Sequence, residues 1–168
     1  MLELAAFSLL FPDLNDLDSF YLPSLQGDLT SIGPYHIFDL YCQDYGCECH
    51  KVTMVIADDS QENVLATIAY GWKSKSYYYK WGLDKDGSQS LTSGFLDPFG
   101  KQTVHSSIFL NFIRRKINRE PQFMIKIKKR YRIFKDHVDS PFYVPIVPPA
   151  QPLPDNVVTL KDYRRERA

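Results

Sequence analysis

The chain has 168 residues, of which 44% are apolar and 14% aromatic, and its 20 basic and 20 acidic residues give a formal net charge of zero. This length and composition predict a single globular domain with a hydrophobic core of its own. No apolar run reaches the roughly 20 residues needed to cross a bilayer, and no segment repeats with a period of ~20 to 50 residues, which excludes membrane-spanning helices and solenoid folds.

The charges are distributed unevenly along the chain. Residues 1–100 contain 14 acidic and 5 basic residues, whereas residues 101–137 contain 2 acidic and 11 basic ones. Such asymmetry is typical of a protein with an anionic partner, and equally of two parts of one fold that attract each other. The sequence leaves both interpretations open.

The first eleven residues are apolar enough to be compared with a secretory signal. They contain Glu3, have no basic start, and run into Pro12 without a small-residue cleavage site. We therefore expect residues 1–11 to form a buried helix and the protein to be cytoplasmic, with no attachment to a membrane. Residues 12–34 mix turn formers with apolar anchors and are expected to form an irregular connection.

Three segments rich in β-branched and aromatic residues follow, at 35–41, 50–57 and 64–70. Turn-forming residues separate them, so they predict successive antiparallel strands. Residues 73–81 are compatible with a further strand or with a short helix. The aromatic residues around Trp72 and Tyr78 are assigned to the core rather than to a binding pocket.

Two amphipathic helices are predicted in the C-terminal half. Val104, Ile108, Phe112 and Ile117 recur at helical spacing, and a second apolar stripe begins after Pro121. The basic residues of the second helix are expected to face solvent; they are Lys126, Lys128, Lys129, Arg130, Arg132 and Lys135. The predicted fold is thus α+β, an antiparallel sheet of three to four strands with two C-terminal helices packed on one face, forming a single domain over residues 1–138.

Residues 139–168 are predicted to form a Pro-rich extended tail outside this domain. Six prolines between 141 and 154 exclude a helix or a central strand. The apolar residues among them predict that part of the tail docks on its own domain, on an unknown protein partner, or on a second copy of the chain. In the last case the arm would make a homodimer.

The three cysteines of the chain, Cys42, Cys47 and Cys49, all fall within eight residues. The C-x4-C-x-C spacing suits a turn between two strands, which brings the sulfurs together, and zinc binds such thiolates in tetrahedral sites. The sequence therefore predicts a zinc site on these cysteines. The fourth ligand stays open between water and four side chains, which are His36, Asp44, His50 and His105. A redox-active cysteine pair and ordinary buried cysteines are the alternatives.

Four segments carry a resemblance to a family of small uncharacterised bacterial proteins. They are GPYHIFDLYCQDYGCECHKV (33–52), ATIAYGW (66–72), LDPFGKQ (96–102) and KKRYRIFK (128–135). The family is characterised by a Y-C-x-(D/N)-x-x-C-(D/E)-C motif, a Y-G-W motif and a late R-H-Y-x-x-F helix. This chain departs from it with His50 in place of an Arg and Arg130 in place of a His. No activity is established for the family, so the resemblance supports the domain limits and the cysteine motif only.

The sequence contains none of the common phosphate-binding, dinucleotide, serine-hydrolase or zincin motifs. The leading interpretation is a metal-binding accessory or interaction module. Two alternatives remain: a nucleic-acid-binding protein that uses the basic helices at 114–135, and a zinc-dependent hydrolase or deaminase in which Glu48 or Asp44 acts as the base.

Overall fold

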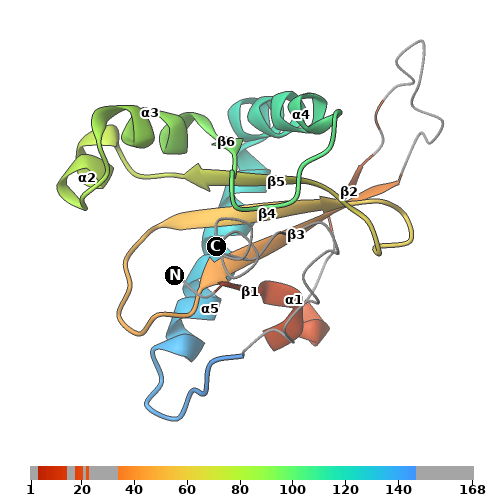
Figure 1. Ribbon diagram of the computed structural model, residues 1–168. Coiled ribbons are helices and arrows are strands. Elements are labelled where there is room, and N and C mark those ends of the chain that lie inside the picture. The colour runs from red at the N-terminus through yellow and green to blue at the C-terminus, as the bar shows by residue number, and fades with distance from the viewer. Residues whose placement is uncertain (1–3, 15–17, 21, 23–33, 147–168) are drawn as a thin grey trace, which may run out of the picture.

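The computed structural model describes residues 4–14, 18–20, 22 and 34–146. Their centre is a six-stranded antiparallel sheet in the order β1-β3-β4-β5-β6, with β2 paired to another part of β3 (Figure 1). The strands are β1 (Leu4–Ala6), β2 (Asp18–Phe20), β3 (Tyr35–Cys42), β4 (Lys51–Ala57), β5 (Val64–Gly71) and β6 (Phe95–Leu96). The helices are α1 (Phe7–Leu10), the short 3-10 helix η1 (Pro12–Leu14), α2 (Lys75–Lys80), α3 (Lys85–Ser93), α4 (Ser106–Arg119) and α5 (Pro121–Val138).

One face of the sheet carries the main core. Ile37 lies opposite Ile56, and Met54 lies opposite Ile68, so alternate residues of β3, β4 and β5 point to the same side. Helices α4 and α5 cover this side with residues of the same apolar cluster, which are Phe109, Ile113, Phe123, Ile127, Phe134 and Val138. The predicted α+β fold with two helices on one face of the sheet is confirmed.

The sheet is larger than predicted because three of its strands are very short. The strands β1, β2 and β6 span only two or three residues each, too few for an alternating pattern to be visible in the sequence. The expected helix over residues 1–11 is wrong at Leu4–Ala6, which pair with β3 in the sheet. Within the described residues 4–11, Phe7–Leu10 alone is helical, because pairing with the edge of β3 overrides the high helix propensity of the preceding leucine and alanine residues.

A smaller second core lies between β5 and the helices α2 and α3. It is formed by Ala69, Tyr78 and Leu91, and it settles the undecided segment 73–81 as helix α2, capped by Ser74. Helix α3 was not predicted because its sequence is mainly polar. Gly71 is needed at the end of β5, since an added Cβ would overlap the phenol of Tyr78.

The free edge of β5 next to β6 is closed by a side chain. The amide of Gln102 donates from Nε2 to the carbonyl oxygens of Thr67, at 2.7 Å, and Asp97, at 2.9 Å, while its Oε1 accepts from the Thr67 N–H. Gln102 thus takes the place of a strand residue. The backbone of Gly100 lies so close to Thr67 that a Cβ would overlap it, which explains the glycine of the LDPFGKQ segment.

A second glutamine holds the start of the tail. The buried Gln43 donates from Nε2 to the Ile146 carbonyl at 3.0 Å, and its Oε1 accepts from the Ile146 N–H at 2.8 Å and from the Tyr143 hydroxyl. Residues 140–146 therefore lie on the domain, whereas residues 147–168, on which the predicted homodimer through the arm depends, lie outside the described residues.

Replacing Gln43 with Ala is expected to release residues 140–146, because the Ile146 backbone then loses both of its hydrogen bonds to the Gln43 side chain. The expected cost is about 1 to 3 kcal/mol in the free energy of unfolding. Limited chymotrypsin digestion, which cuts after Phe142 and Tyr143, should become faster in this variant. Gln89→Ala, at an exposed site on α3, is the control. Equal cleavage rates in the two variants would contradict the prediction.

Candidate metal centre

The cysteines lie where β3 ends and the chain turns toward β4. Cys42 is the last residue of β3, and a turn closed by the Cys47 N–H donating to the Asp44 carbonyl at 3.2 Å reverses the chain. Gly46 takes a positive φ of 64° in this turn, which glycine adopts without strain. Because β4 begins only at Lys51, Cys47 and Cys49 converge on Cys42 from the loop that precedes this strand.

Helix α5 fixes this loop from one side. Lys135 donates to the Asp44 carbonyl at 2.7 Å and pairs with Asp139 at 3.1 Å, and Asp139 in turn accepts from the Gly46 N–H at 2.8 Å. Charge-assisted hydrogen bonds of this kind are stronger than neutral ones. Lys135 is buried by these contacts, so the expectation that it faces solvent is wrong.

Aromatic hydroxyl groups hold the end of the loop at His50. The His50 N–H donates to the Tyr131 hydroxyl at 3.4 Å, and the His50 carbonyl accepts from the Tyr78 hydroxyl at 2.6 Å. The backbone of His50 lies in the left-handed region, with φ of 47°. Strained backbone of this kind persists only where the surroundings fix it, and here α2 and α5 do so from two sides.

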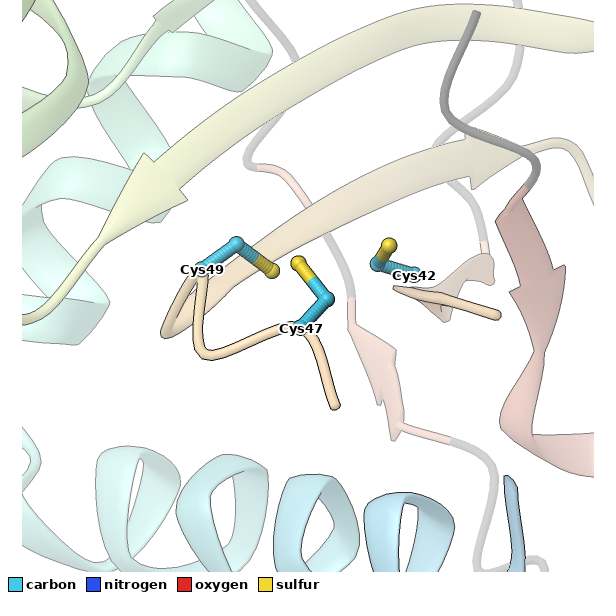
Figure 2. A group of neighbouring side chains, drawn as sticks. All are labelled: Cys42, Cys47 and Cys49. Atoms are coloured by element: carbon cyan, nitrogen blue, oxygen red, sulfur yellow. The ribbon is translucent and has the colours of Figure 1, made fainter. Parts of the chain in front are cut away.

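The three sulfur atoms lie within 4.8 Å of one another and point into a common space, as Figure 2 shows. A tetrahedral zinc ion with Zn–S bonds of about 2.3 Å needs sulfur atoms about 3.8 Å apart. Small side-chain rotations therefore suffice to close the cluster around an ion. Cys42 and Cys49 are 1% and 0% exposed, while Cys47 is half-buried, so the cluster is accessible from the side of Cys47.

The thiols differ in acidity because they are hydrogen-bonded to each other. The Cys42 thiol donates to Cys49, which lowers the pKa of Cys49 and raises that of Cys42. Burial raises the pKa of Cys47. Cys49 is therefore the first of the three to ionise. A metal ion must displace the protons of the thiols that it binds, so binding becomes weaker as the pH falls.

None of the four side chains considered as a fourth ligand joins the cysteines in the described part of the chain, where these three residues alone form such a group. His36 lies at the opposite end of β3, 3.7 Å from Asp59. His105 precedes α4, beside Thr103 and Ser106, which bond to Leu65 near the start of β5. The side chain of Asp44 is exposed.

The fourth candidate, His50, forms a wall of a cavity instead. Its ring contacts Trp72, Tyr77 and Tyr131 at centroid distances of 6.2, 5.7 and 5.4 Å. Burial and the positive charge of Lys73 lower the pKa of His50, so its imidazole is neutral at pH 7. Trp72 was assigned to the core, and its place in this cavity was missed.

The cavity has a volume of about 490 Å³ and opens beside Cys47. Its walls come from the cysteine loop, from the residues after β5, and from α5. The lining residues are Cys47, Glu48, His50, Trp72, Lys73, Lys128, Tyr131, Arg132, Lys135, Asp136 and Asp139. No single segment of the sequence could have revealed it, because its walls are up to about ninety residues apart in the chain. The three thiols and this cavity are the candidate functional site.

Among the helices that the structure describes, none has the length and apolar character needed to cross a bilayer. Comparisons with known protein families, curated proteins and solved structures give no match for this chain.

Proposed function

We propose that this protein is a metal-binding module that holds a zinc ion on Cys42, Cys47 and Cys49. The observation that carries the proposal is the convergence of three sulfur atoms to within 4.8 Å, two of them on fully buried residues. Thiolates favour zinc among the common biological cations. The role of the module is that of an accessory or interaction protein in which the metal stabilises the loop between β3 and β4.

Protein purified without chelator is expected to contain about one zinc ion per chain, measured by atomic emission. Cys42→Ser and Cys49→Ser should each lose most of it, since a hydroxyl is a much poorer ligand for zinc than a thiolate. Ser60→Ala, in the turn between β4 and β5, is the control and should keep its metal. Metal-free wild-type protein that also takes up no added zinc would refute the proposal.

A second candidate function, zinc-dependent hydrolysis or deamination, is favoured by the open side of the centre. Cys47 lines a cavity together with Glu48, whose carboxylate has the chemistry of a general base for a zinc-bound water. Thiolate-rich shells are more typical of structural zinc sites, which ranks this candidate second. A hydrolytic activity that disappears in Glu48→Gln while the zinc content is unchanged would reverse the order.

Nucleic-acid binding by the helices at 114–135 has less support. Of the six basic residues of α5, Arg130 and Lys135 are buried in contacts with the protein itself. Lys128 and Arg132 line the cavity beside Cys47, whereas Lys126 and Lys129 line a different one. The basic residues are therefore divided over separate surfaces instead of forming one track for a phosphate backbone.

A further inference from the structure

We infer that the cavity beside Cys47 binds a small anionic thiol, whose sulfur becomes the fourth ligand of the metal ion and whose negative group is bound by basic residues on the cavity wall. This inference rests on the proposed metal site and adds a class of ligand to it. Three observations carry it: the missing fourth ligand, the arrangement of the charged side chains, and the position of the cavity.

The first observation concerns the metal. The part of the chain described here offers three thiolates and no fourth side chain at the cluster. Three thiolates on a divalent ion give a soft centre whose formal net charge is negative, and the ligand that such a soft centre favours is another sulfur. A thiol entering the fourth position would bind as the thiolate and release its proton to solvent.

The second observation concerns charge. Lys128, Arg132 and Lys135 follow one another on one face of α5 and line the cavity, which Lys73 joins after the end of β5. Lys135 is occupied by Asp44 and Asp139.

Lys73, Lys128 and Arg132 form no ion pair with any described residue and are exposed. Glu48 and Asp136 line the same cavity and likewise form no ion pair within the described ranges, so the positive excess there is small. A ligand with a single negative group suits it better than a highly charged one. Arg132 offers the planar donor pair that binds a carboxylate or a phosphate with two hydrogen bonds.

The third observation is the position and size of the cavity. Its volume of about 490 Å³ lies within the range of about 300 to 1,000 Å³ typical of small-molecule sites. Its aromatic side, made of His50, Trp72 and Tyr131, provides apolar surface between the cysteine loop and the charged residues of α5.

The experiment uses full-length protein in which cobalt(II) replaces zinc, because a fourth thiolate adds sulfur-to-cobalt absorption in the near ultraviolet. Two probes of similar size are titrated: 3-mercaptopropionate, which carries a carboxylate, and 2-mercaptoethanol, which is uncharged. The carboxylate is expected to improve the affinity by about tenfold. The Lys128→Gln/Arg132→Gln double variant should lose this preference, and Glu48→Gln should increase it. Lys129→Gln, on the same helix but outside the cavity, should leave it unchanged.

Each outcome separates the two proposals. Equal affinity for the two thiols, or a preference that survives in the double variant, overturns the inference while the metal site stands. No spectral response to either thiol has the same meaning, provided that cobalt is retained after desalting. A protein that takes up neither cobalt nor zinc overturns the metal site and this inference with it.

Discussion

Removal of the metal ion is expected to lower the free energy of unfolding by about 4 kcal/mol when free zinc in the reference sample is near a thousand times its dissociation constant. The reason is linkage: the ion binds the three converged thiolates of the folded chain and finds no such site in the unfolded one. Urea unfolding followed by circular dichroism, with zinc and with excess chelator, measures the difference.

The metal-free protein is expected to keep its α+β fold, unlike a zinc finger. The main core includes Cys42 and Cys49, but most of its members are apolar residues of the three central strands and of α4 and α5, which pack together without a metal ion. Metal removal should therefore loosen the structure only in the loop between β3 and β4. Faster hydrogen exchange of the amides in this loop would show the change. In the Cys47→Ser variant, excess chelator should change the free energy of unfolding little, since the stabilisation by bound zinc is already lost. Coincident unfolding curves of wild-type protein with and without chelator would show that the cysteines bind no stabilising ion.

The elements that the sequence predicts correctly are those with a long periodic signal. The strands β3, β4 and β5 each have seven or eight residues rich in β-branched and aromatic side chains, and α4 and α5 span 14 and 18 residues with regular apolar stripes. The short strands at the sheet edges exist because β3 and β5 offer unpaired backbone groups there. That cause lies in the tertiary structure and leaves no local pattern.

The candidate site likewise has one part that the sequence predicts and another that it does not. The meeting of the three sulfurs could be predicted because one turn determines it, and the sequence of that turn is local. The cavity could not be predicted, because residues that line it, such as Lys73 and Arg132, come from segments that are far apart in the sequence. The left-handed backbone of His50 also escaped prediction, because it depends on the hydroxyl groups of Tyr78 and Tyr131.

One residue that we expected in solvent could have been placed in the core from the sequence pattern. Arg130 was expected in solvent, yet it lies four residues before Phe134 and three after Ile127 on the buried stripe of α5 and is only 5% exposed. Asp39 similarly takes an inward position on β3, between Ile37 and Tyr41, and is 3% exposed. Two opposite charges in core positions predict a buried ion pair between sheet and helix, because an unpaired buried charge is too costly.

The buried charges of Arg130 and Asp39 are compensated by close polar contacts. Arg130 Nη1 lies 3.0 Å from Asp39 Oδ1, while Asp39 Oδ2 accepts from the Tyr41 hydroxyl at 2.8 Å. The guanidinium also lies 5.1 Å from the ring centroid of Phe7, so it connects α5 with both β3 and α1. These contacts of Arg130 determine how α5 docks on the sheet.

Replacing Arg130 with Met is expected to destabilise the protein by about 3 to 5 kcal/mol, because the Asp39 carboxylate stays buried without its cation. Arg132→Met, two residues along the same helix and exposed, should change the free energy of unfolding by less than about 0.5 kcal/mol. Urea unfolding midpoints of the two variants provide the comparison.

The double variant Arg130→Met/Asp39→Leu tests the cause of that loss. Replacing both charges with apolar groups removes the unpaired carboxylate, and the Tyr41 hydroxyl keeps an acceptor in the Ile127 carbonyl at 3.0 Å. Methionine can also preserve the contact with Phe7. Stability should therefore recover most of what the single variant loses. If the double variant were instead as unstable as the sum of its single replacements, the loss would come from packing around α5 and not from an uncompensated charge.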